Sequence, residues 1–127
     1  MKVEIIKLDD FDRGICFVND KVTFVPNVVP GDIANIKIIK EHKKYNEASL
    51  LDLVNPSSDR IDALCPYFGI CGGCTLQTLS YEKGIDYKKE KVINYFKKME
   101  LIINPSLIAN DKPYNYRNKI TLKVVNG

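Results

Sequence analysis

Three cysteines, Cys65, Cys71 and Cys74, lie within ten residues and are the side chains best suited to chemistry in this sequence. Thiolates bind soft or borderline metals, and the C-x5-C-x2-C spacing lets one loop bring three sulfur atoms onto one centre. Gly69, Gly72 and Gly73 remove side chains where the backbone must bend closely around an inorganic core. The pattern predicts a metal site on this loop.

Zinc and an iron–sulfur cluster compete for such a site. Structural zinc sites usually show two separated ligand pairs, and the sequence has no second pair. The single histidine, His42, lies in a lysine-rich stretch, and we expect it to be exposed and not a ligand. Cys16 stands apart among apolar residues and is expected to be a small buried hydrophobe, although it could act as a fourth ligand if its strand folded onto the loop.

Length and composition limit the kind of protein. With 127 residues, 45% of them hydrophobic and 28% charged, the chain can form one ordinary domain or two very small ones, and a large catalytic fold does not fit. The first residues alternate charged and apolar side chains, and no apolar run approaches the length of about 20 residues that spans a bilayer. We expect a cytoplasmic monomer without membrane contact.

The segment before the cysteines is predicted to be a small β-barrel. Asn19-Asp20 suits a tight hairpin turn, and Pro30-Gly31 suits a type II turn. Closing the sheet would let fewer than 60 residues enclose a core, as in oligonucleotide-binding (OB) barrels. The five predicted strands are Val3–Leu8, Gly14–Val18, Val22–Val25, Ile33–Ile39 and Ala48–Val54.

The segment after the cysteines is predicted to start with a helix from Tyr81 to Met99, with Ser80 as its N-cap. Lys119–Val125 alternates like a strand. The fold class is therefore α+β and mostly β: an OB-like barrel in residues 1–58, a cysteine-rich loop in residues 59–80, and a helix with the first strand of an incomplete domain in residues 81–127. One face of the helix is expected to be apolar, with Tyr81, Ile85, Val92, Phe96 and Met99.

Four stretches give the sequence a family resemblance. Asp12–Ile15 and Phe24–Ile33, with its Pro-Gly-Asp turn, resemble the TRAM domain, a small β-barrel attached to RNA-modifying enzymes. Cys65–Gln77 resembles the cluster signature of RNA uracil-C5 methyltransferases that combine a TRAM domain with a [4Fe–4S] cluster. The Tyr-Arg strand that opens their central domain is matched by Tyr116–Lys119, so the resemblance covers nearly the whole chain in the same order.

The resemblance implies an RNA-binding, iron–sulfur-binding N-terminal part of an S-adenosylmethionine-dependent RNA uracil-C5 methyltransferase, acting on 23S ribosomal RNA or on transfer RNA. In this family, the fourth cluster cysteine and the catalytic domain follow the segment that Cys65–Lys119 resembles. We therefore expect a fragment that holds three of four cluster ligands, no catalytic or S-adenosylmethionine-binding residue, and no activity without its C-terminal partner domain. The alternatives are a free-standing nucleic-acid-binding module with structural zinc and, ranked last, a small electron carrier.

Charge adds candidate RNA contacts. Residues 1–60 carry 9 Lys+Arg and 10 Asp+Glu, whereas residues 61–127 carry 10 and 6, so the basic character lies after the start of the cysteine loop. Lysines bind phosphate as point charges, and an arginine can also stack on a base. For most of the candidate lysines named below, exposure to solvent without any RNA contact is an equally good interpretation. The candidates are Lys37, Lys40, Lys43 and Lys44 on the barrel, Lys88, Lys89 and Lys91 on the helix, and Arg117 and Lys119.

Overall fold

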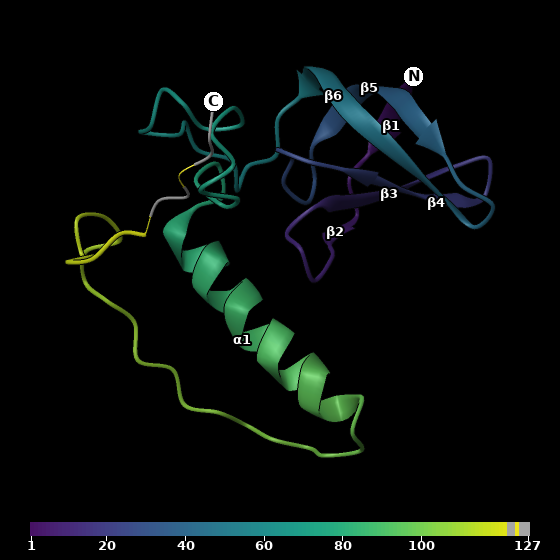
Figure 1. The fold of residues 1–127 in the computed structure, drawn as a ribbon. Coiled ribbons are helices and arrows are strands. Elements are labelled where there is room, and N and C mark those ends of the chain that lie inside the picture. The colour runs from purple at the N-terminus through teal and green to yellow at the C-terminus, as the bar shows by residue number, and fades with distance from the viewer. Residues whose placement is uncertain (122–123, 125–127) are drawn as a thin grey trace.

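The computed structural model describes residues 1–121 and 124, which form a mixed six-stranded sheet followed by one long helix. The predicted mostly-β class is confirmed (Figure 1). The order of the strands in the sheet is β1-β5-β6-β4-β3-β2. The strands are β1 (Lys2–Glu4), β2 (Lys7–Leu8), β3 (Gly14–Val18), β4 (Lys21–Val25), β5 (Ile33–Glu41) and β6 (Tyr45–Asn55).

The first predicted strand is divided in two because its pairing partner changes. β1 pairs antiparallel with β5, and β2 pairs antiparallel with β3. Between them, the Ile5 N–H donates to the Asp32 carbonyl at 2.9 Å and the Ile6 N–H donates to the Ile15 carbonyl at 2.9 Å. One short stretch of chain thus pairs with both ends of the sheet, which leaves six strands where five were predicted.

The predicted turns have the expected backbone geometry. Asn19 and Asp20 have φ angles of 50° and 61°, and Gly31 has a φ of 86°. The turn between β5 and β6 is shorter than predicted, because pairing continues to Glu41 opposite Asn46. The lysine-rich stretch is therefore a short hairpin turn and not a long loop.

The core lies inside the curved sheet and uses one side of each strand. Cys16 is 1% exposed and its thiol donates to the Thr23 carbonyl, so the prediction of a buried hydrophobe is confirmed. Gly14 begins β3 where a Cβ would lie 2.2 Å from Cγ2 of Val28, so the backbone is packed too closely for any side chain. The buried core residues are Ile5, Cys16, Val18, Val25, Val28, Ala34, Ile36 and Ala48.

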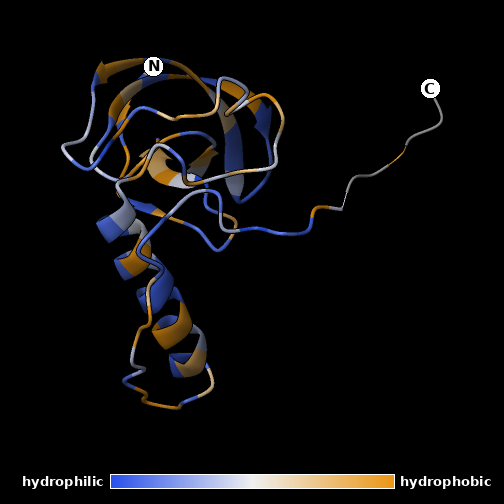
Figure 2. Ribbon diagram, turned by 90° about the vertical axis from the view of Figure 1, so that its left-hand side faces the viewer, coloured by the Kyte–Doolittle hydropathy of each residue, from blue (hydrophilic) through white to orange (hydrophobic). Residues whose placement is uncertain are grey.

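Helix α1 (Tyr81–Lys97) ends two residues before the predicted Met99. Ser80 is the N-cap residue, but its hydroxyl makes no capping bond in the described structure; its backbone N–H donates to the Asp59 carbonyl instead. Figure 2 shows hydrophilic and hydrophobic residues along the length of α1. The apolar contact of α1 is made through Tyr87, which was not on the predicted apolar face and packs against a small cluster of Leu8, Val29 and Leu79.

The chain beyond α1 has no regular secondary structure in its described residues, 98–121 and 124. Of the predicted strand Lys119–Val125, residues 122–123 and 125 lie outside the described part, and residues 119–121 and 124 are not in a strand. The Tyr81 hydroxyl donates to the Asn110 carbonyl, which holds this segment near the start of α1. Within the described residues, no helix is long and apolar enough to cross a membrane.

Candidate nucleic-acid interface and cysteine loop

The cysteine loop is a series of tight turns. The Cys65 N–H donates to Oε1 of Gln77 at 3.2 Å, and the Cys71 N–H donates to the Tyr67 carbonyl at 3.0 Å. Gly69 and Gly72 have φ angles of 82° and 74°, a region that favours glycine. The glycines therefore allow the backbone bends that the sequence pattern indicated.

The three cysteines carry free thiols, Cys71 and Cys74 exposed and Cys65 half-buried. Among residues 1–121 and 124, no three His, Cys, Asp or Glu side chains are grouped closely enough to hold a metal ion. The donor set fits an iron–sulfur cluster in kind, since soft thiolates are its usual ligands. A Cβ on Gly73 would lie 3.4 Å from Sγ of Cys71, so this sulfur sits over a position without a side chain.

His42 is not exposed as predicted, because its side chain is only 26% exposed. Its ring stacks on Tyr45 with centroids 4.2 Å apart, and its Nε2 lies 3.1 Å from Oε1 of Glu47. These partners leave the ring half-buried. Cys16 lies inside the sheet core, so it does not join the cysteines of the loop.

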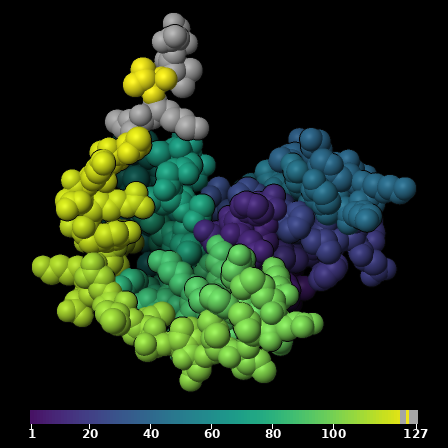
Figure 3. Space-filling model, turned by 60° about the horizontal axis from the view of Figure 1, so that its bottom comes forward, coloured from purple at the N-terminus to yellow at the C-terminus, as the bar shows by residue number. Residues whose placement is uncertain are grey.

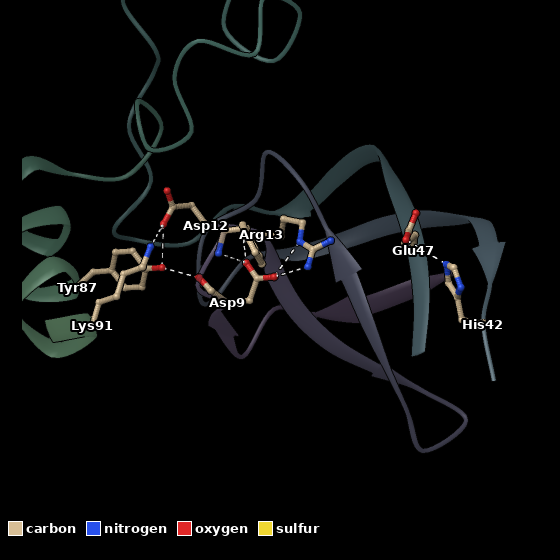
Figure 4. A network of polar contacts seen from close by, with 8 residues as sticks. Asp9, Asp12, Arg13, His42, Glu47, Tyr87 and Lys91 are labelled. Carbon is tan, nitrogen blue, oxygen red and sulfur yellow. Dashed lines mark hydrogen bonds and ion pairs between the residues drawn. The ribbon is translucent and has the colours of Figure 1, made fainter. Parts of the chain in front are cut away.

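Asp12 joins three parts of the molecule. Its carboxylate accepts hydrogen bonds from the Thr75 hydroxyl at 2.7 Å, the Tyr87 hydroxyl at 2.9 Å and Nζ of Lys91 at 3.1 Å. Burial acts to raise the pKa of Asp12, but the bonds from Thr75, Lys91 and Tyr87 outweigh it and the pKa is lowered. Figure 4 shows Tyr87 and Lys91 converging on the turn that carries Asp9 and Asp12, and Figure 3 shows N-terminal residues against α1.

Asp32 joins the Pro-Gly-Asp turn to the segment after β6. Its fully buried carboxylate accepts bonds from the backbone N–H groups of Val29 at 2.8 Å and Ser57 at 2.9 Å. Arg60 donates through Nε at 3.0 Å and through Nη2 at 2.7 Å, and its Nη2 also reaches the Asn27 carbonyl. Burial acts to raise the pKa of Asp32, but these bonds, first those of Arg60, lower it overall.

The structure separates the predicted basic contacts into groups. On the barrel, the predicted lysines are exposed along β5 and its turn, whereas Lys91 of α1 is committed to Asp12. His42 lies in the turn between β5 and β6, and Figure 4 shows it on the opposite side of the sheet from Lys91. The lysines of the β5–β6 turn and Lys91 therefore do not form one patch. Lys37, Lys40, Lys43, Lys44, Lys88, Arg117 and Lys119 are exposed, and Lys89 is half-buried.

Sequence reasoning missed the polar residues that connect the barrel to the cysteine loop and α1. Asp12 was noted only as part of a family motif, and neither Arg60 nor Tyr87 was singled out. The available signal was the acidic run Asp9–Asp12 followed by Arg13, since several carboxylates in one turn need cationic or hydroxyl partners.

The barrel defines the class of domain with which the chain begins. A family model described as the TRAM domain matches residues 1–51, which contain β1 to β5 and the first part of β6. The Pro-Gly-Asp turn built on Asp32 and the turn that carries Asp9 and Asp12 both fall inside this range. Residues 1–51 of this chain therefore resemble a TRAM domain.

The relatives identify the kind of protein in which this domain occurs. The chain is 39% identical over 131 residues to the tRNA (uracil(54)-C(5))-methyltransferase of Schizosaccharomyces pombe, covering 95% of this chain and 25% of that protein. It is 35% identical over 129 residues to the 23S rRNA (uracil(1939)-C(5))-methyltransferase RlmD of Francisella tularensis subsp. novicida, covering 97% and 28%. The chain thus matches the N-terminal portion of RNA uracil-C5 methyltransferases.

A solved structure is similar as well. The tRNA (uracil-54, C5)-methyltransferase of Pyrococcus abyssi, in complex with S-adenosyl-L-homocysteine, is 28% identical with a TM-score of 0.53. The match covers 75% of this chain and 21% of that one. Across these comparisons the chain spans about a quarter of the length of its relatives.

Proposed function

We propose that this chain is the RNA-binding, iron–sulfur-binding N-terminal part of an S-adenosylmethionine-dependent RNA uracil-C5 methyltransferase. The supporting observation is similarity over nearly the whole chain, barrel, cysteine loop and helix together, to enzymes named for this reaction. The relatives modify uracils in both ribosomal and transfer RNA, so the proposal is for the reaction class that they share. No residue of this chain is assigned a catalytic role.

We divide the chain into a TRAM barrel in residues 1–58, a cysteine-rich loop in residues 59–80, and a segment from α1 onwards in residues 81–127. Support for the middle division comes from an isolated β-bridge between Arg60 and Leu79, which brings the ends of the loop together. A target uridine must be unstacked and placed in a pocket before it can react, so the rest of the RNA must be bound elsewhere. The barrel would bind that part of the RNA.

Cys65, Cys71 and Cys74 would supply three thiolates to a [4Fe–4S] cluster, with a fourth ligand from outside this chain. When bound, the cluster would supply a rigid sulfur-ligated centre that fixes the loop. The chain's own part is to present the thiolates and to shape the loop through its glycines and the bond from Cys65 to Gln77. Zinc in the same loop is the alternative.

Metal analysis after anaerobic purification tests this part of the proposal. A brown protein that contains iron and sulfide would support the cluster. We expect this chain to bind the cluster weakly and to lose it in air, because the fourth ligand is missing and Cys71 and Cys74 are exposed. Cys71→Ser and Cys74→Ser should remove most of the iron, whereas Cys16→Ala, in the core, should retain it. A colourless protein with one zinc per chain would contradict the cluster and support the alternative.

A further inference from the structure

A row of planar side chains crosses the outside of the barrel. The Arg13 guanidinium lies 5.4 Å from the Phe11 ring centroid and 4.3 Å from that of Phe24. Phe24 meets Tyr45 edge to face with centroids 5.6 Å apart, and Tyr45 stacks on His42 at 4.2 Å. The row runs from the β2–β3 turn through Phe24 on β4 to the start of β6 and the β5–β6 turn.

Both ends of the row are held in place by carboxylates. Oδ1 of Asp9 accepts the backbone N–H groups of Phe11 at 2.9 Å and Arg13 at 2.8 Å, and Oδ2 accepts the Arg13 side chain at 2.7 Å and 2.8 Å. At the far end, Glu47 holds His42. Figure 4 shows both pairs. The planes are therefore arranged before any ligand arrives.

The row is exposed at Phe11 and half-buried at its other members, and positive charge flanks its far end. Phe11 is 74% exposed. Phe17, near the row, is 53% exposed; it pairs with Val22, and Val22 pairs with Tyr45. Beyond His42, the turn carries the exposed Lys43 and Lys44. Exposed aromatic faces next to lysines fit a ligand that is both planar and anionic.

We propose that this row, Phe11, Arg13, Phe24, Tyr45 and His42, is a stacking surface for the unpaired bases of RNA, with Lys43 and Lys44 on the phosphates. The inference rests on the proposed RNA-binding function and gives it a location and a substrate form. Every base has a face that can stack on an aromatic ring or a guanidinium plane, whereas paired bases in a duplex are covered by their neighbours. The surface is therefore selective for single-stranded RNA.

Fluorescence anisotropy with a labelled single-stranded RNA of about 12 nucleotides, a typical site length for small barrels, tests the surface on the full 127-residue chain. Phe11→Leu and Tyr45→Leu are each expected to weaken binding about tenfold, since each removes one stacking face. Phe11 is on an exposed turn, so its variant should fold normally, and circular dichroism checks both. The control is Tyr95→Leu, a ring on α1 that is 63% exposed and lies outside the row, which should leave affinity unchanged.

Salt dependence separates stacking from charge. The two ring variants should leave the slope of log K against log salt unchanged. They keep every lysine, so RNA binding releases the same number of counterions. Lys43→Gln and Lys44→Gln should each reduce that slope by about 0.7, the value for one phosphate contact on a single strand. Unlabelled duplex RNA should compete poorly with the single strand.

The outcomes are distinguishable. If the unaltered chain bound no RNA, the proposed function would fail and the stacking surface with it. If it bound RNA but Phe11→Leu and Tyr45→Leu behaved like Tyr95→Leu, the proposed function would stand and this surface would be overturned. Equal competition by duplex RNA would likewise overturn the stacking surface alone.

Discussion

Replacing Asp32 by alanine is expected to lower the free energy of unfolding by about 3–5 kcal/mol, a loss that a domain of this size rarely tolerates. The carboxylate is fully buried and Arg60, its partner, is 14% exposed. Removing the Asp32 carboxylate leaves the Arg60 guanidinium without its counterion and the N–H groups of Val29 and Ser57 without an acceptor. Urea denaturation followed by circular dichroism measures the change.

Asp52→Ala is the matched control, since Asp52 is an exposed aspartate that accepts one bond, from Asn35, on the outside of the sheet. Its effect should stay within about 0.5 kcal/mol. A loss at Asp32 no larger than the loss at Asp52 would show that the buried ion pair does not stabilise the turn.

The pH dependence of stability depends on the same carboxylate. The pKa of Asp32 is lower in the folded chain than its ordinary value of 3.8, so the folded state favours the charged form. Its contribution is fully present above about pH 4, the unfolded pKa, and is lost as pH falls through the lowered folded pKa. Asp32→Asn should flatten this acid limb, whereas Asp52→Asn should leave it unchanged.

Much of the sheet could be predicted because its signals are local. The pair Asn19-Asp20 and the Pro30-Gly31 turn need only a few residues to define their backbone, and both have the expected positive φ angles. The change of partner at Ile5 and Ile6 could not be predicted this way. Nothing in an alternating run shows that its first half pairs with β5 and its second half with β3.

In the candidate site, as in the sheet, local features could be predicted and long-range contacts could not. The spacing of Cys65, Cys71 and Cys74 predicted one loop, but spacing does not determine whether three sulfur atoms meet, and the described structure does not gather them. The contact of Tyr87 with Asp12 joins residues 75 positions apart. Helical periodicity favoured an apolar face through Tyr81 and missed Tyr87, because a tyrosine docking through its hydroxyl has no signature in that pattern.

Asp12→Asn is expected to loosen α1 from the barrel. Asparagine tolerates the positive φ of 63° at this position, so the turn is kept while the charge that receives Thr75, Tyr87 and Lys91 is removed. Hydrogen bonds to a charged group contribute about 1.5–3 kcal/mol, so we expect a loss of roughly 2 kcal/mol from this contact. Amide protons of α1 should then exchange roughly thirtyfold faster, measured by mass spectrometry.

Asp10→Asn is the control in the same turn. Asp10 and its partner Lys98 are each 69% exposed and 3.4 Å apart, and such surface pairs contribute little to stability. Exchange in α1 should therefore stay close to that of the unaltered chain. If Asp12→Asn gave the same exchange rates as Asp10→Asn, the helix would be held by its apolar contacts with Leu8 and Leu79 and not by the carboxylate.

Thr75→Val extends the Asp12 prediction to the cysteine loop. Thr75 comes directly after Cys74, and its hydroxyl is the link that joins the loop to Asp12. Removing it should speed exchange in residues 71–77 while leaving α1 nearly unchanged, because the bonds from Tyr87 and Lys91 remain. In Asp12→Asn both segments should loosen together, since one carboxylate holds both. Loosening of α1 in Thr75→Val would instead mean that the loop itself supports the helix.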